Sequence, residues 1–190
     1  MQLKEMFDMQ KQLDTRIERS HDRKLTFVDK IVAAIVELGE AANEIRWFKK
    51  WSNKGQSSKE VILEELIDGV HFILSIGNSI ESNLIYLHDY TAKMELSDFS
   101  EDFVRIIDGL VSVKVSYQNK HKNLLDYLYV DLMENYLGFI CKLGFDMKDI
   151  EMMYYKKNEI NHKDRIIIIK LLRGGRFEKM DRGRSTILRR

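Results

Sequence analysis

Residues 59–80, KEVILEELIDGVHFILSIGNSI, decide the fold of this 190-residue chain. Their apolar side chains occupy more than one face of a helix, and a helix that is apolar nearly all round lies at the centre of a protein. Ser57 or Ser58 precedes the stretch as an N-cap, and only Ser57 would complete a capping box with Glu60. The stretch therefore predicts a central helix that other elements must surround.

Apolar residues recur at helical spacing through most of the remaining chain, which predicts further helices over residues 3–17, 26–48, 97–113, 124–143 and 147–159. Proline is absent, so the chain has few helix breakers. The run 166–169 consists of four isoleucines and fits either the end of a helix or a short strand. We expect an all-α helical bundle that forms one domain over residues 1–170.

The charge balance argues against a dedicated binder of nucleic acid or of membrane surfaces, because 31 basic residues face 30 acidic ones. Residues 171–190 differ, since seven basic residues there outnumber Glu178 and Asp181. We expect them to form a mobile basic tail that contributes little to folding. The single Cys141 predicts a reduced, buried thiol, and the lack of a signal peptide or a long apolar stretch predicts a cytoplasmic protein.

Two pairs of acidic residues stand on apolar helices. Glu37 and Glu40 are three residues apart, as are Glu65 and Asp68, so each pair presents two carboxylates on one helix face. Carboxylates in such apolar surroundings must lie at a groove, pair with cations or bind a metal, because a bare buried charge is costly. If the two helices pack side by side, the four groups converge on one point.

Four converging carboxylates are ligands that suit Mg²⁺, with Mn²⁺ as a possible substitute. Glu44 and Glu64 are close enough in sequence to join them. The residues alone leave a second interpretation open, in which these are solvated helix faces paired with lysine and arginine.

The spacing Glu37-x-x-Glu40 followed by Glu65-x-x-Asp68 resembles the signature of the all-α, MazG-like nucleoside triphosphate pyrophosphohydrolases. The wider context is similar to their dimeric dUTPase branch, which is often phage-encoded. The matching features are an early Met9-Gln10 helix and the strings VELGEAANEIRWFKKW, LEELIDGVHFILSIGN and YYKKNEIN, and together the resemblance covers about residues 3–165.

The resemblance implies Mg²⁺-dependent hydrolysis of dUTP to dUMP and pyrophosphate by a homodimer. It assigns both the metal-ligand and the catalytic role to Glu37, Glu40, Glu65 and Asp68. A metal-activated water would attack the triphosphate, and Glu37 is the candidate base that takes its proton.

The resemblance also implies a set of substrate-binding residues. Those around the base and deoxyribose are Gln10, Trp51, His71, Phe72 and Asn78, and those toward the phosphates and sugar are Lys157, Asn158 and Asn161. After Asn161 the chain departs from the family pattern, and Arg165 takes the place of an arginine expected one residue earlier. Composition alone favours core packing for the aromatic residues and for a lone histidine on an apolar helix.

Three rival functions remain from sequence. The first is the same chemistry on dCTP or on another nucleotide, including a damaged one. The second is a helical regulatory or protein-binding module that has lost catalysis, which the altered segment after Asn161 suggests. The third is a nucleic-acid binder that uses the basic tail, which the near-neutral body of the protein makes the weakest of the three.

Overall fold

The structure is a computed structural model that describes residues 3–20, 24–81 and 98–174, with the side chains of residues 20 and 162–174 left out. Within these ranges it contains six helices and no strand: α1 (Leu3–Ser20), α2 (Phe27–Ile45), α3 (Lys59–Ile80), α4 (Phe99–Gln118), α5 (Lys122–Lys142) and α6 (Met147–Gly174). The expected all-α class is confirmed.

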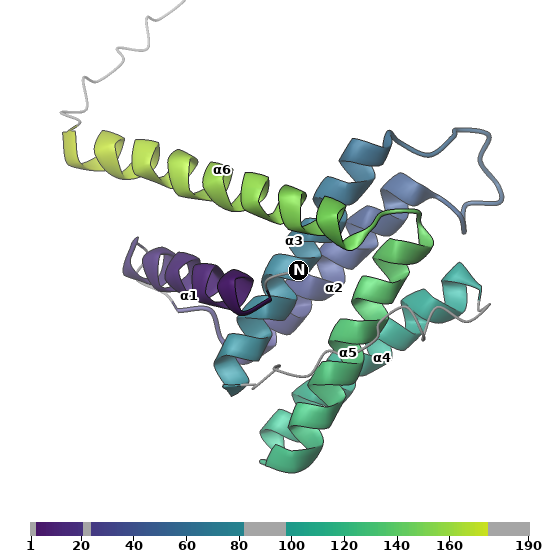
Figure 1. Cartoon of the computed structure of the whole chain (residues 1–190), viewed down its shortest axis with the longest axis horizontal. Helices are drawn as coiled ribbons and strands as arrows, with labels where there is room; N and C mark the ends of the chain where they lie inside the picture. Colours follow the sequence, from purple (N-terminus) through teal and green to yellow (C-terminus); the bar gives the residue numbers. More distant parts are fainter. Residues whose placement is uncertain (1–2, 21–23, 82–97, 175–190) are drawn as a thin grey trace, which may run out of the picture.

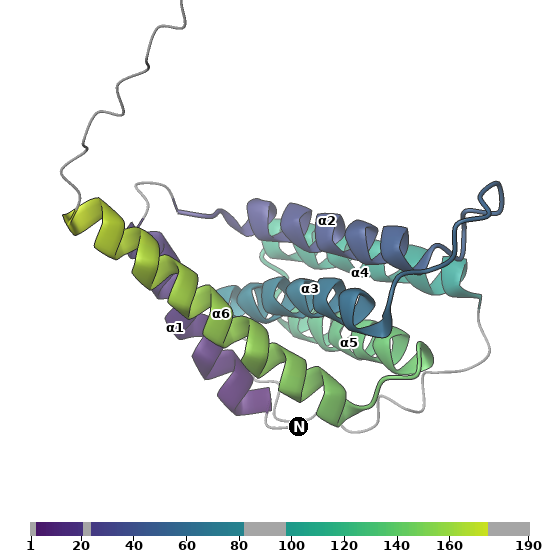
Figure 2. The same cartoon turned by 90° about the horizontal axis from the view of Figure 1, so that it is seen from above.

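Four of the helices, α2 to α5, lie side by side as a bundle (Figures 1 and 2). Helices α1 and α6 cross one side of this bundle diagonally, in contact with each other and with α3 (Figure 2). Helix α3 is consequently the element that joins the bundle to the α1–α6 pair.

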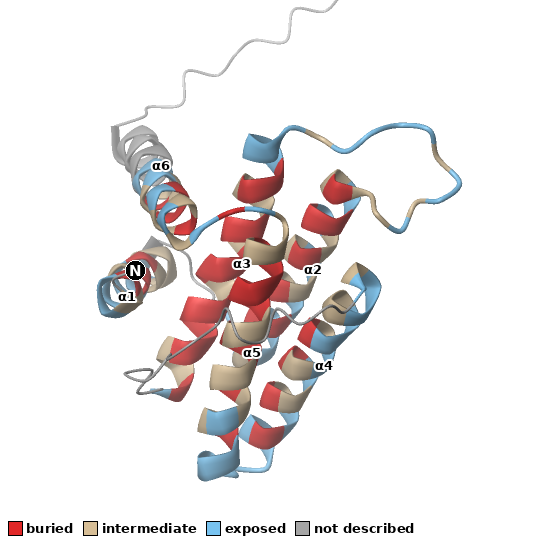
Figure 3. Cartoon of the chain, turned by 45° about the vertical axis from the view of Figure 1, so that its right-hand side comes forward, coloured by how far each residue is buried: buried red, intermediate tan, exposed pale blue. Residues whose placement is uncertain are grey.

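Helix α3 is buried along most of its length (Figure 3). The prediction of a central helix over residues 59–80 is confirmed with the same bounds. Its buried side chains include two polar ones, His71 and Ser75. Burial of polar groups in the central helix requires partners from other helices, and these partners form part of the candidate site described below.

Helix α3 begins after Ser58, whose hydroxyl accepts a hydrogen bond from the backbone N–H of Val61. The alternative N-cap, Ser57, is used differently, because its hydroxyl donates to the carboxylate of Glu44 and its backbone N–H to the Glu44 carbonyl. The capping box that Ser57 would have formed with Glu60 is therefore absent from this described helix end. Ser57 instead ties the start of α3 to the last turn of α2.

Helix α2 starts where the sequence predicts, and there Thr26 and Asp29 form a capping box that was not predicted. Its expected end at Phe48 is wrong, since the helix ends at Ile45. Arg46 adopts a left-handed conformation (φ 66°) and its N–H closes on the carbonyl of Ala42. This turn brings Trp47 against Phe139 of α5, with ring centroids 5.9 Å apart. Aromatic packing therefore overrides the helical periodicity here.

Two tyrosines of α5 fit into two glycine positions of α3. The hydroxyl of Tyr136 donates to the carbonyl of Leu66 at 2.9 Å, and that of Tyr129 to the carbonyl of Ile73 at 2.8 Å. A Cβ on Gly69 would lie 1.9 Å from the Tyr136 hydroxyl, and one on Gly77 2.2 Å from that of Tyr129. The absence of side chains at these glycines thus lets α5 approach α3 and fixes their register.

The C-terminal region continues further as helix than expected. Helix α6 runs to Gly174, so the isoleucine run 166–169 is helical and residues 171–174, predicted as the start of the tail, continue it. Residues 175–190 lie outside the described residues. Cys141 is half-buried, and burial raises the pKa of its thiol, as expected of an unreactive cysteine. None of the helices in the described ranges could cross a membrane.

Candidate active site

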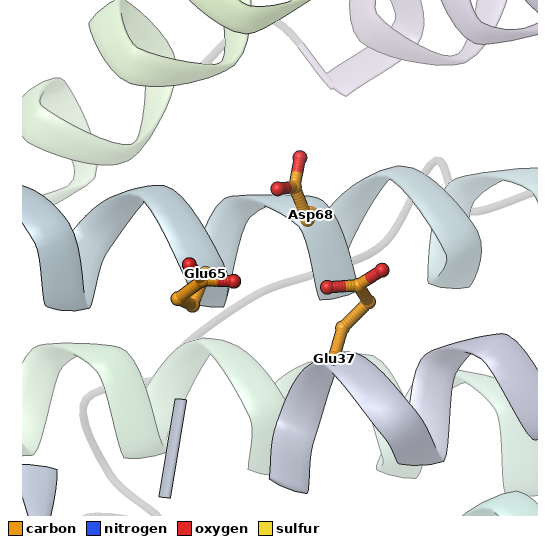
Figure 4. Close-up of side chains that lie close together, drawn as sticks. All are labelled: Glu37, Glu65 and Asp68. Carbon is orange, nitrogen blue, oxygen red and sulfur yellow. The ribbon is translucent and has the colours of Figure 1, made fainter. Parts of the chain in front are cut away.

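Three carboxylates from two helices converge on one side of α3. Glu37 extends from α2 toward Glu65 and Asp68 of α3 (Figure 4), and one oxygen from each lies within 4.8 Å of the others. We call these three residues the carboxylate cluster. It brings together three of the four predicted metal ligands, and all three are partly buried.

The carboxylate cluster concentrates negative charge in a partly buried place. Burial, followed by repulsion from Asp68, Glu40 and Glu65, raises the pKa of Glu37 to about 7. Burial and neighbouring carboxylates also raise the pKa of Glu65, although Lys157 acts in the opposite direction. A carboxyl group with a pKa near neutrality can exchange a proton at working pH, as a general base must.

Asp68 differs from the other two because it has a cationic partner. Nζ of Lys157, on α6, lies 2.6 Å from its Oδ2. The pKa of Asp68 is nevertheless raised, since its burial outweighs the ion pair. Both side chains are about one-fifth to one-quarter exposed, so the pair lies at the rim of the cluster within reach of a ligand.

The neighbouring acidic residues are used differently. Glu40 is exposed on α2 and lies outside the 4.8 Å group, although its charge raises the pKa of Glu37 and Glu65. Glu44 accepts from the Ser57 hydroxyl. Glu64 lies 3.3 Å from Nζ of Lys156. The predicted interpretation as paired surface carboxylates therefore fits Glu64, whereas Glu44 has a structural role.

A buried polar cluster lies next to the carboxylates, between α1, α3 and α6. Oε1 of Gln10 is 2.7 Å from Nδ1 of His71 and 3.3 Å from the hydroxyl of Tyr154. The rings of His71 and Tyr154 are stacked with centroids 4.4 Å apart. Gln10 is 4% exposed and His71 5%, so these two predicted base-binding residues share one buried network.

Two buried polar atoms are left over in this region. Among the side chains that the structure describes, Nε2 of His71 and Nδ2 of Asn158 are buried without a hydrogen-bond partner. Asn158 is only 1% exposed and interacts with the hydroxyl of Tyr154. Burial, with help from Lys157, lowers the pKa of His71 to about 3, so its ring is neutral at working pH. Unpaired buried polar atoms are costly, which makes these two atoms candidate contacts for a ligand.

The remaining predicted residues are placed as follows. Phe72 packs partly buried against the core, and Nδ2 of Asn78 donates to the carbonyl of Phe7 at 3.0 Å. Trp51 is 77% exposed on the turn after α2, where its ring meets Phe48. Asn161 is half-buried on α6, and the side chain of Arg165 is outside those that the structure describes.

Three residues of this region were not predicted from the sequence. Tyr154 stacks on His71, and Asp14 and Lys30 form a partly buried ion pair of 3.7 Å beneath Gln10. Asp14 lies one helical turn after Gln10, a spacing that places both on one face of α1. Lys30 stands at the start of an otherwise apolar run. A lysine in such surroundings needs an anionic partner, so this position could have indicated its ion pair from the sequence.

Comparison with known proteins adds one finding. A protein-family profile described as dUTPase matches residues 2–166 of the chain. The match includes every residue of the carboxylate cluster and of the buried polar cluster. A search of curated proteins finds no match.

Proposed function

The chain belongs to the dUTPase family and is a dUTP-hydrolysing enzyme, and we propose that it releases dUMP and pyrophosphate with Mg²⁺ at the carboxylate cluster. The observation that carries this proposal is the convergence of Glu37, Glu65 and Asp68, whose oxygens lie within 4.8 Å of one another. Phosphate-bound Mg²⁺ prefers such carboxylate oxygens to nitrogen or sulfur.

The donor set fits a divalent cation. The pKa of each of the three groups is raised, first by burial and then by the neighbouring carboxylates, although Lys157 acts in the opposite direction. A bound Mg²⁺ would supply the missing positive charge, neutralise phosphate oxygens and lower the pKa of a bound water. We propose Glu40 as a fourth ligand, since its charge already acts on Glu37 and Glu65. Mn²⁺ has similar ligand preferences and should substitute.

The chain's own residues supply the proton chemistry and the phosphate contacts. Glu37 is the proposed base that takes the proton of the attacking water; its pKa is about 7 in the metal-free protein, and a bound Mg²⁺ would lower it. Lys157 stands beside Asp68 at the rim of the cluster, where its ammonium group offsets the charge of the triphosphate. Asn161, one turn further along α6, and Arg165 extend this contact toward the phosphates and sugar.

The two unpaired polar atoms support uracil as the base. The neutral His71 ring has one nitrogen that accepts a hydrogen bond, and Nδ2 of Asn158 donates one. Uracil offers the complementary pair, an N3–H donor beside carbonyl acceptors, whereas N3 of cytosine carries no hydrogen. We therefore propose that His71 and Asn158 read the base and favour dUTP over dCTP.

Gln10 takes an indirect part in this proposal. Its amide was predicted from sequence to bond uracil directly. In the structure, however, the NH₂ group of that amide is bonded to Asp14 and its oxygen to His71. We propose that Gln10 acts on the base through His71. Phe72 and Asn78 remain proposed neighbours of the nucleoside, and Trp51 would have to move from its exposed position to join them.

The enzyme is proposed to act as a homodimer. The resemblance to the dimeric branch of the family suggests it, and exposed valines on α2 and α4 supply an apolar surface. The exposed valines are Val28, Val32, Val36, Val104, Val111 and Val115, at 40–53% exposure. Helices α2 and α4 lie side by side (Figure 2), so a second copy could cover both.

Pyrophosphate release from dUTP, dCTP and dTTP, with Mg²⁺ and with chelator, tests the proposal. We expect release from dUTP to exceed that from the other two and to need the metal. Glu37→Gln should abolish it, whereas the control Glu60→Gln should not, because Glu60 is exposed and pairs with Lys156. Release from dCTP at an equal rate would reject the base assignment. No release from any nucleotide would favour the non-catalytic interaction module instead.

A further inference from the structure

Asp14 lies where three helices meet, below the buried polar cluster. From α1, its Oδ1 accepts a hydrogen bond from Nε2 of Gln10 at 2.7 Å, and its Oδ2 accepts one from the hydroxyl of Ser75 on α3. Nζ of Lys30 on α2 is 3.7 Å from the same Oδ2 and donates to Ser79 at 2.8 Å. The carboxylate of Asp14 is therefore held in place from two other helices.

This arrangement decides which way the Gln10 amide points. An ionised carboxylate only accepts hydrogen bonds, so the NH₂ group of Gln10 must face Asp14. Its carbonyl oxygen Oε1 then faces His71, 2.7 Å from Nδ1. The single hydroxyl hydrogen of Tyr154 is directed to the carbonyl of Met6, at 2.9 Å.

The amide orientation in turn decides the tautomer of His71. A carbonyl oxygen only accepts, so Nδ1 of His71 must carry the hydrogen. In a neutral ring the other nitrogen, Nε2, then has a free lone pair. That atom is one of the two buried polar atoms that have no partner among the described residues. The chain of bonds from Asp14 through Gln10 thus leaves an acceptor at Nε2.

We propose that Asp14 is a positioning residue for base recognition, which holds His71 in the Nδ1–H tautomer through the amide of Gln10. The role in base recognition rests on the proposed function, whereas the tautomer does not. Lys30 and Ser75 support it by fixing the carboxylate of Asp14. Without Asp14 the Gln10 amide is free to turn over, and His71 can then present an N–H at Nε2, which an N3–H of uracil cannot bond.

The tautomer can be read directly from the ¹⁵N chemical shifts of ¹⁵N-histidine-labelled protein without ligand, with His71→Gln to assign the signal. In the unmodified protein we expect His71 to be neutral and protonated at Nδ1. A signal from the Nε2–H form would overturn the proposal.

Asp14→Ala and its conservative partner Asp14→Asn then test the role of Asp14. We expect Asp14→Ala to shift His71 toward the Nε2–H form, and Asp14→Asn, which keeps an acceptor for Gln10, to shift it less. Asp8→Ala is the control, because Asp8 lies on the same helix in an exposed pair with Lys4. An unchanged tautomer in Asp14→Ala would overturn the positioning role.

Binding of dUMP and dCMP, measured by titration calorimetry without metal, tests base recognition separately from catalysis. Asp14→Ala should lower the preference for dUMP by roughly tenfold or more, since a site built to form a hydrogen bond loses selectivity when the bond is lost. If the tautomer changes and the preference does not, Asp14 has no part in recognition. Failure of dUTP hydrolysis in the unmodified enzyme would reject the proposed function and leave these binding results unaffected.

Discussion

Nζ of Lys157 lies 2.6 Å from Oδ2 of Asp68, so α6 supplies the cation that partly balances the carboxylates of α2 and α3. The pair connects a helix of the diagonal α1–α6 pair to the bundle at the point where we place the phosphates. It gives Asp68 a cationic partner, whereas the pKa of Glu37 is raised to about 7 and that of Glu65 is also raised. The pKa of Asp68 is raised as well, so replacing either carboxylate by its amide should not destabilise the metal-free protein.

Glu37→Gln should make the metal-free protein more stable above pH 7 and change it little at pH 5. The folded-state pKa of Glu37 is raised from 4.5 to about 7, so the folded protein binds more protons than the unfolded chain between these values. Stability linked to this group is present below pH 4.5 and is lost as the pH rises to about 7. We expect a gain of about 1 kcal/mol at pH 8, because solvent screens this half-buried group. Urea unfolding at both pH values measures it, and an equal effect at both would contradict the shift.

Asp68→Asn should leave the metal-free protein equally stable or slightly more stable, because burial raises the pKa of Asp68 despite its ion pair with Lys157. Mg²⁺ should raise the melting temperature of the unmodified protein, since a ligand that binds only the folded state stabilises it. Thermal melts with and without Mg²⁺ should show a smaller increase for Asp68→Asn. An equal increase would remove Asp68 from the metal site.

Lys157→Gln should raise the KM for dUTP roughly tenfold or more, since hydrogen bonds to charged groups contribute about 1.5–3 kcal/mol. The adjacent Lys156 provides a matched control, because it pairs with Glu60 and Glu64 at the surface. Steady-state kinetics of Lys157→Gln and Lys156→Gln separate a phosphate contact from a general loss of positive charge. Similar KM values for the two variants would reject the contact.

Gly77→Ala should destabilise the protein by about 1–3 kcal/mol, the usual cost of overpacking. Its Cβ would lie 2.2 Å from the Tyr129 hydroxyl and 2.5 Å from Cζ, so the rigid ring must move and its bond to Ile73 would be lost. Gly39→Ala is the opposite case, because no atom lies within 4 Å of its Cβ and alanine favours the helix by about 0.5–1 kcal/mol. Denaturant unfolding of the two variants should give changes of opposite sign.

Val32→Lys should convert the proposed dimer to monomers. Val32 is 53% exposed on α2, and a lysine there would place a charge in an apolar interface. Light scattering coupled to size-exclusion chromatography measures the mass of both proteins. Val61→Lys is a control on another helix, at 38% exposure. A monomeric unmodified protein would show that these valines are not a dimer interface.

The helices were largely predictable from periodicity, while their ends depended on tertiary contacts. Residues 59–80 are predicted with the correct bounds because nearly every face of that helix is apolar. The end of α2 was placed too late, since nothing local in the sequence requires Arg46 to turn left-handed. The turn is explained by Trp47, whose ring packs on α4 and α5, far away in sequence.

The carboxylates of the candidate site could be predicted from the sequence, whereas most of its buried polar contacts could not. Glu37, Glu65 and Asp68 converge because α2 and α3 pack side by side, as their apolar faces require. The bond of Lys157 to Asp68, and the contacts of Asp14, depend on how α6 and α1 cross α3, which no local pattern encodes. From a single sequence, the candidate reactive residues are therefore easier to predict than the residues that hold them in place.

Helix α3 carries members of both clusters, with Asp68 and His71 three residues apart. At ~1.5 Å per residue they are separated by about 4.5 Å along one rigid axis. Because α5 packs closely on α3 at Gly69 and Gly77, helix α3 would set the distance between the proposed phosphate contacts and the proposed base contacts. Inserting one residue between Asp68 and His71 would turn the two side chains apart by ~100°. New base preferences can therefore arise by substitution on α1 or α6 without altering this spacing.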